Sequence, residues 1–85
     1  MCQSKAYLIA RGVESEVMND VVKIHREGNH LVLSDMRGAT RKVENAYVGD
    51  VDTLTDKIVL YERDGQVARV EALGEARARE PVTAD

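Results

Sequence analysis

The sequence predicts an all-β fold, a small antiparallel barrel or sandwich of about five to six short strands. Short apolar runs recur at roughly ten-residue intervals and are separated by turn residues, as is typical of such folds. In several runs apolar and polar residues alternate, which indicates strands with one buried face. The 85 residues suffice for one domain. With three tyrosines and neither phenylalanine nor tryptophan, the core must consist of valine, leucine, isoleucine and alanine.

The first strand is expected from Lys5 to Arg11. Its apolar residues fall on both sides, with Tyr7 and Ile9 on one and Leu8 on the other, so both faces should be covered. Gly12 then ends the strand.

A hairpin is expected next. In the strand from Val22 to Glu27, Val22 and Ile24 point one way and the intervening polar side chains point to solvent. Gly28-Asn29 tolerates positive φ and supplies the turn. The returning strand covers His30 to Asp35, and its two leucines share a face.

Three further strands are expected along the chain. Met36-Arg37-Gly38 forms a turn before a short strand from Ala39 to Val43, and Asn45 ends that strand. Two more apolar segments follow, from Tyr47 to Val51 and from Ile58 to Tyr61. The three strands between Val22 and Val43 are expected to form a β-meander.

Two segments are ambiguous. Ser15 to Asp20 reads as a loop or as the start of a bent strand, and we favour the strand. Gln66 to Ala72 alternates like a strand, but it also has apolar residues at near-helical spacing, so periodicity does not decide. We expect a barrel domain over residues 1–62 and an extension over residues 63–85, which from Gly74 onward reads as a short frayed helix or a disordered tail.

The charge pattern is that of an ordinary solvated surface. Twelve basic and fifteen acidic residues give a net charge of −3, and the two signs are interspersed. A nucleic-acid partner is not expected, because the only basic cluster is Arg37, Arg41 and Lys42 and aromatic platforms are absent. A single cysteine excludes an internal disulfide, and no secretory signal or long apolar run is present. We therefore expect a cytoplasmic protein without a membrane partner.

The single cysteine, Cys2, is the strongest candidate metal ligand. Removal of Met1 would make it the N-terminal residue, with a thiol and a free α-amine that together close a five-membered chelate ring on a metal. The amide nitrogen of Gln3 is a possible further donor. Such nitrogen and sulfur donors favour square-planar Ni(II) or Cu(II). The alternative is that Cys2 is an inert small residue, as single cysteines in cytosolic proteins often are.

One chain supplies too few ligands to complete four-coordination. A two-fold dimer with its N-termini together would provide two thiolates and two nitrogens, which suggests one metal per dimer.

Other constellations are weaker. His25 and His30 flank the hairpin turn and read either as a second metal site or as surface histidines. Asp50, Asp52 and Asp56 cluster around a turn, where carboxylates usually bond to the local backbone. A phosphate-binding glycine loop, paired cysteines and a His-x-x-x-His helix are all missing, so we expect no enzyme.

In order and spacing, several short segments resemble the CooT-type small nickel-binding proteins, a family that has also carried the label of predicted RNA-binding proteins. The resemblance covers roughly residues 1–62. The segments that carry it are Met1-Cys2, Lys5 to Leu8, Val17 to Val21, Gly28 to Leu33, Ser34 to Gly38, Lys42 to Glu44 and Lys57 to Leu60.

The resemblance implies an SH3-like barrel, a homodimer and one Ni(II) held near the two-fold axis by the processed N-terminal cysteines. The family's cysteine corresponds to Cys2 here. It further implies a role in nickel supply for maturation of carbon monoxide dehydrogenase, with that nickel enzyme or its maturation proteins as partners. The residues after Glu62 depart from the family pattern and leave partner geometry open.

Two other functions compete with this hypothesis. Small barrels often bind RNA, although the negative net charge opposes that here. The protein could also be a metal-independent interaction module in which Cys2 is incidental.

Overall fold

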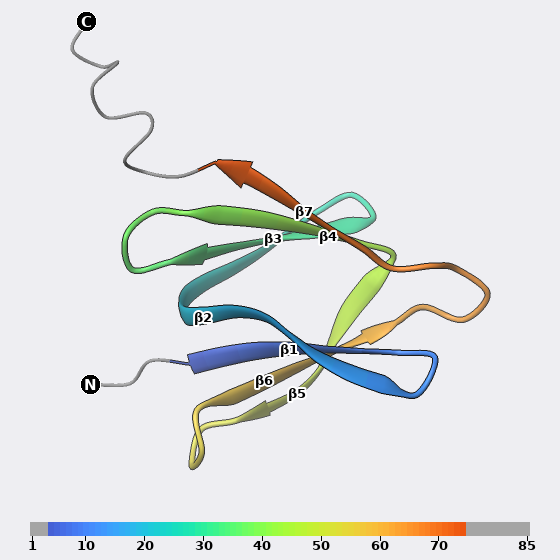
Figure 1. The fold of residues 1–85 in the computed structure, drawn as a ribbon, viewed down its shortest axis with the longest axis horizontal. Helices are drawn as coiled ribbons and strands as arrows, with labels where there is room; N and C mark the ends of the chain where they lie inside the picture. Colours follow the sequence, from blue (N-terminus) through green and yellow to red (C-terminus); the bar gives the residue numbers. More distant parts are fainter. Residues whose placement is uncertain (1–3, 75–85) are drawn as a thin grey trace, which may run out of the picture.

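A computed structural model describes residues 4–74 of the chain, and all of its regular structure there is β-strand. The seven strands are labelled in Figure 1. Their bounds are β1 Ser4–Ala10, β2 Val13–Glu27, β3 His30–Asp35, β4 Thr40–Glu44, β5 Ala46–Asp52, β6 Lys57–Glu62 and β7 Arg69–Gly74. The predicted all-β class is confirmed, with one strand more than the expected five to six.

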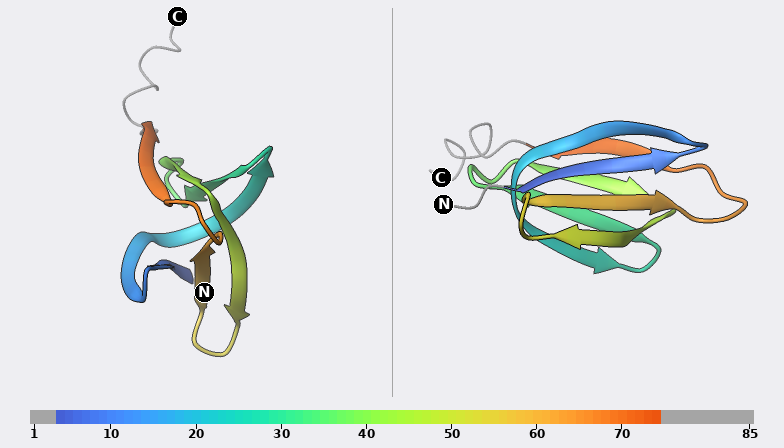
Figure 2. Two further views of the ribbon diagram at one scale, coloured as in Figure 1. Left: turned by 90° about the vertical axis from the view of Figure 1, so that its right-hand side faces the viewer. Right: turned by 90° about the horizontal axis from the view of Figure 1, so that it is seen from below.

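The strands form one sheet in the order β5-β6-β1-β2-β3-β4-β7. All pairs are antiparallel except β1 and β6, which run parallel. The sheet coils on itself in the manner of a small barrel, because the long strand β2 bends through it (Figure 2). The order leaves β5 and β7 as its two edges, so the coil is not closed by a hydrogen-bonded ladder.

The core is aliphatic, as the composition requires. Its largest fully buried side chains are Leu33, Leu60 and Val43. The other buried hydrophobic residues are Ala6, Leu8, Val17, Met18, Val21, Leu31, Ala39, Ala46, Ile58 and Val59. Residues 4–74 bury no polar or charged side chain, so packing of branched aliphatic residues is what stabilises the coil.

In the long strand β2, the prediction that Val22 belongs to the buried face is wrong. Val21 is buried while Val22 is 59% exposed, although Val22 was expected to share an apolar face with Ile24. The reason is an irregularity in the ladder with β3, where the register shifts between Val21 and Lys23. Asp20, just before it, has a φ of 54°. Such a bulge changes which side chains point inward. The segment from Ser15 to Asp20 is strand, as favoured.

The predicted turns lie where the sequence indicates. Gly28 and Gly38 have φ values of 64° and 92°, which a residue without Cβ adopts at little cost. Asn45 has a φ of 59° and separates β4 from β5, in agreement with its predicted role.

The ambiguous C-terminal segment is a strand rather than a helix. β7 pairs antiparallel with β4, and Val70 lies opposite Val43. The loop that leads to it is fastened by two side chains: Glu62 Oε2 accepts a hydrogen bond from the Ala68 amide at 2.8 Å, and Asn45 Nδ2 donates to the Val67 carbonyl at 3.0 Å. The expected helix or tail from residue 75 onward lies outside the described residues, and the domain boundary at residue 62 stays a prediction.

Candidate functional site

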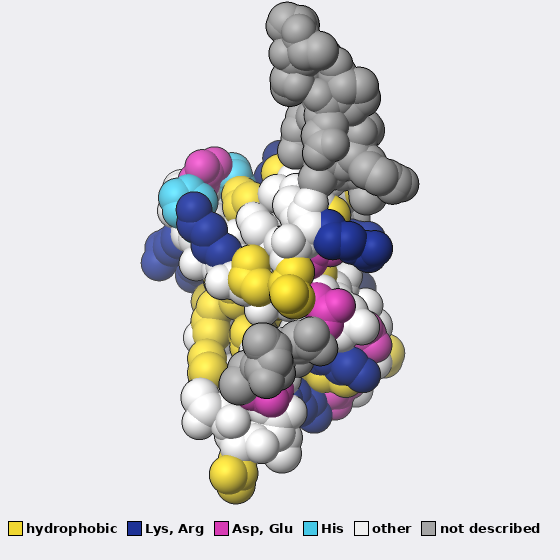
Figure 3. Space-filling model, turned by 90° about the vertical axis from the view of Figure 1, so that its left-hand side faces the viewer, with side chains coloured by type: hydrophobic (Ala, Val, Ile, Leu, Met, Phe, Trp, Pro, Cys, Tyr) yellow, Lys and Arg dark blue, Asp and Glu magenta, His cyan; other side chains and the backbone are white. Residues whose placement is uncertain are grey.

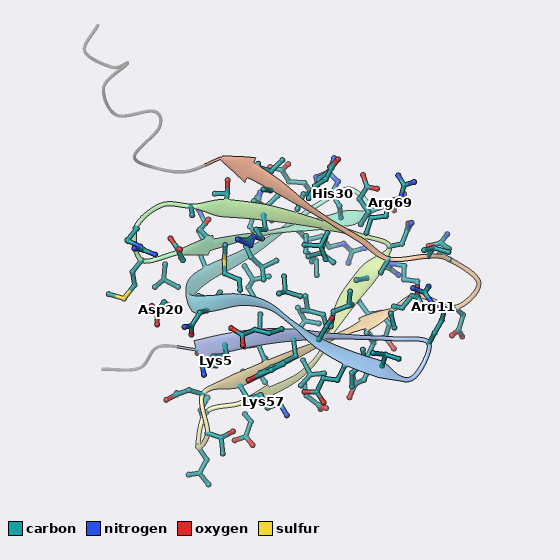
Figure 4. The ribbon with its side chains drawn as sticks, in the orientation of Figure 1. Lys5, Arg11, Asp20, His30, Lys57 and Arg69 are labelled. Atoms are coloured by element: carbon teal, nitrogen blue, oxygen red, sulfur yellow. The ribbon has the colours of Figure 1, made fainter. Side chains whose placement is uncertain are left out.

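The predicted metal ligands, Cys2 and Gln3, lie outside the described residues, which begin with Ser4. The structure shows where the next residues, Ser4 and Lys5, lie. Ser4 pairs with Val21 across the β1–β2 ladder, and the Lys5 amide donates a 3.0 Å hydrogen bond to the Asp56 carbonyl. β1 therefore begins at a defined place between the bend of β2 and the β5–β6 turn (Figure 4).

This end of the barrel is polar. One shallow pocket of about 350 Å³ has Asp20, Asp35, Arg37 and Arg41 in its lining. A second pocket of about 300 Å³ is lined by residues of β1, β6 and the β5–β6 turn.

In the second pocket Lys57 links two neighbouring side chains. Its Nζ lies 5.0 Å from the centre of the Tyr7 ring and 3.3 Å from Glu14 Oε2. On the face shown in Figure 3, Lys and Arg side chains (dark blue) gather at the upper left beside the histidines, and most acidic and apolar side chains lie elsewhere on the face.

The two histidines have a carboxylate between them that the sequence interpretation missed. Glu27 Oε2 lies 2.9 Å from His25 Nε2, and Glu27 Oε1 lies 3.5 Å from His30 Nε2. In Figure 3 both imidazoles (cyan) flank an acidic side chain (magenta). The two-residue turn could have predicted this arrangement. Its register places Glu27 opposite His30, and His25 lies two residues before Glu27 on the same face of β2.

No metal site results from this arrangement. Among the residues that the structure describes, no three His, Cys, Asp or Glu side chains are grouped so that they could hold a metal ion. The His25 and His30 side chains are 46% and 30% exposed, and both lie beside the Glu27 carboxylate.

Two of the three aspartates around the β5–β6 hairpin accept hydrogen bonds through their carboxylates, while the third, Asp56, accepts one through its backbone carbonyl. Asp52 Oδ1 accepts hydrogen bonds from the Leu54 and Thr55 amides at 3.0 and 3.3 Å, and these bonds lower the pKa of Asp52. Asp50 accepts a 2.8 Å hydrogen bond from the Tyr61 hydroxyl, which raises the pKa of Tyr61. These carboxylates stabilise the hairpin, as acidic turn residues usually do.

Two members of the small basic cluster are engaged within the chain, and one of them, Lys42, forms ion pairs. Lys42 Nζ lies 3.2 Å from Glu44 Oε2 and 3.5 Å from Glu71 Oε1, and the hydrogen bond to Glu44 is the main cause of its raised pKa. Arg41 Nη1 donates to the Val17 carbonyl at 3.3 Å. With two of its three members engaged within the chain, the cluster does not form the basic stripe typical of nucleic-acid binders.

None of residues 4–74 belongs to a helix long and apolar enough to span a membrane.

Comparison with known proteins assigns the chain to a family. No individual curated protein matches the sequence. The family model described as CO dehydrogenase accessory protein CooT matches residues 1–61, which run from the N-terminus through Tyr61 in β6. The chain therefore belongs to the CooT family of CO dehydrogenase accessory proteins.

Proposed function

We propose that this protein is a nickel-binding accessory protein that holds one Ni(II) between two chains and supplies it for enzyme maturation. The observation that carries the proposal is the family match, which includes Cys2 and places the chain among CO dehydrogenase accessory proteins. The role is one of binding and delivery rather than catalysis.

The donor set fits nickel. After removal of Met1, Cys2 would offer a thiolate and an α-amine, and the backbone nitrogen of Gln3 is a further donor. Nitrogen and thiolate donors suit square-planar Ni(II). Both Cys2 groups must lose protons to bind, so affinity should rise with pH.

The fixed start of β1 supports a site at this position. β1 lies between β6 and β2, with a ladder on each side. The hydrogen bond from the Lys5 amide to the Asp56 carbonyl ties the start of β1 to the β5–β6 turn. Cys2 precedes Lys5 by three residues in the sequence. No grouping of three possible ligands within residues 4–74 competes with it.

A homodimer completes the coordination. Two N-termini brought together on a two-fold axis would supply two thiolates and two nitrogens, which gives one Ni(II) per dimer. The proposed partners are a nickel enzyme such as carbon monoxide dehydrogenase, or its maturation proteins, in the cytoplasm.

The test is a Ni(II) titration of protein whose lack of Met1 has been verified by mass. We expect a sulfur-to-nickel charge-transfer band that saturates at one nickel per two chains and is abolished by Cys2→Ala. The matched control is the double variant His25→Ala/His30→Ala, which removes both imidazoles and should leave the band and the stoichiometry unchanged. Absence of the band in the parent protein, or its loss in the histidine variant, would contradict the proposal.

A further inference from the structure

A groove lies at the seam between the edge strand β5 and the β2–β3 hairpin, near the end of β6 rather than at the start of β1. It has a volume of about 300 Å³ and is lined by Ile24, Arg26, Leu31, Tyr47, Val48 and Arg63. In the left panel of Figure 2, β5 runs along one margin of the sheet, and the β2–β3 hairpin projects above it.

The floor of the groove is apolar and the strand beside it has a free edge. Leu31 belongs to the core, whereas Tyr47 and Val48 are 44% and 39% exposed. β5 pairs only with β6 and ends the sheet, so its second edge takes part in no ladder within the described chain. An exposed strand edge next to apolar side chains can add a further strand.

Two arginines give the groove its charge. The Arg63 guanidinium carbon lies 5.8 Å from the centre of the Tyr47 ring, and within residues 4–74 the Arg63 Nε is the buried side-chain polar atom that lacks a hydrogen-bond partner. Arg26 Nε makes only a 3.3 Å hydrogen bond to the Gly28 carbonyl. Unlike Arg11, Lys42 and Lys57, neither arginine forms an ion pair in the described part of the chain.

We propose that this groove docks an acidic segment of a partner protein, bound in extended conformation along β5. The backbone of the segment would pair with the edge of β5, its apolar side chains would cover Tyr47 and Val48, and its carboxylates would take the guanidinium groups of Arg26 and Arg63. Arginine suits this role because its planar group binds a carboxylate through two parallel hydrogen bonds.

A second copy of the chain fits the groove less well. Its β5 would have to bring carboxylates to the arginines, but Asp50 is engaged by the Tyr61 hydroxyl and Asp52 by two turn amides. The ladder of β5 is also irregular between Val48 and Asp50, which disfavours symmetric pairing of two such strands. An acidic partner supplies its own carboxylates and brings a regular strand, so only one of the two paired strands is irregular.

The test uses the full chain, labelled with ¹⁵N, and two blocked synthetic peptides of alternating valine and threonine. One peptide ends in two glutamates and the other in two lysines. We expect the acidic peptide to shift the amide resonances of Leu31, Tyr47 and Val48, with binding that weakens at high salt. Arg26→Gln, at an exposed position, and Arg63→Gln should each lower the affinity at least tenfold. Arg69→Gln, at an exposed position on β7 that does not line the groove, is the matched control and should leave binding unchanged.

Several results would overturn the proposal. They are the absence of shifts at millimolar acidic peptide, shifts confined to other strands, and equal binding of the lysine peptide. A concentration-dependent doubling of the mass that Arg26→Gln abolishes would assign the groove to a second copy instead. Cys2→Ala, which tests the nickel site, should not alter peptide binding, so the two proposals can fail separately.

Discussion

Gly49 lies beneath an aromatic ring, and Gly49→Ala should destabilise the protein. A Cβ atom at this position would overlap the Cδ2 and Cε2 atoms of Tyr61. Two contacts hold the ring in place: its hydroxyl donates to Asp50 at 2.8 Å, and the ring lies against Tyr47 in a tilted arrangement with 5.8 Å between ring centres. Gly49 is not among the positive-φ residues, so the conflict is one of space rather than of backbone conformation.

Overpacking a core usually costs about 1–3 kcal/mol. Gly49 is exposed, but the overlap with the ring of Tyr61 and the two contacts that hold this ring lead us to expect about 2 kcal/mol for Gly49→Ala. For a domain of this size that corresponds to a fall of roughly 10 °C in Tm. Urea unfolding followed by circular dichroism measures the loss.

The control is the same substitution in a Tyr61→Ala background, where the overlapping ring is gone. There Gly49→Ala should change the free energy of unfolding by less than about 0.5 kcal/mol. An equal loss in both backgrounds would show that the ring is not the cause and would refute the reasoning.

Three further predictions concern the core, a titration and the added strand. Leu33→Ala should cost about 2–5 kcal/mol of unfolding free energy in the urea assay, because Leu33 is fully buried, whereas Leu54→Ala, at a 90% exposed position, should be nearly neutral. Absorbance titration should show that Asp50→Asn lowers the pKa of Tyr61, since the bond to Asp50 raises it; the stability from this pair is present below the ordinary tyrosine pKa and is lost as pH rises through the raised one. Glu62→Ala removes the acceptor of the Ala68 amide and should speed hydrogen exchange in β7 but not in β1; unchanged β7 exchange would contradict that role.

The sequence predicted the strands and turns well wherever local signals decide. Alternation placed Leu31 and Leu33 on a buried face, and Gly28 and Asn45 marked turns that require positive φ. It failed where the ladder is irregular: the shift near Val22 depends on pairing with β3 and leaves no mark on periodicity.

Non-local pairings were also out of reach. The assignment of β7 as a strand depends on its bonds to β4, because its own residues fit two periodicities equally well. The parallel pairing of β1 with β6 departs from the predicted antiparallel barrel for the same reason.

For the candidate site, chemistry could be predicted but geometry could not. Cys2 is proposed as a ligand from residue type and position alone, and this stays a prediction because Cys2 lies outside the described residues. The carboxylate shared by His25 and His30 follows from the hairpin register, which requires counting across the turn rather than along the strand. The engagement of Asp52 with local amides was expected from the usual behaviour of turn carboxylates.

The parallel pairing of β1 with β6 has a consequence for the order of events during synthesis. Tyr7 pairs with Val59, a residue 52 positions later in the chain. Such distant contacts form late, because a long loop must close before they contribute. β1 is synthesised first, but its ladder with β6 can form only after nearly all of the described strands have been synthesised. Removal of Met1, which the nickel proposal requires, would then act on a chain in which this ladder has not yet formed.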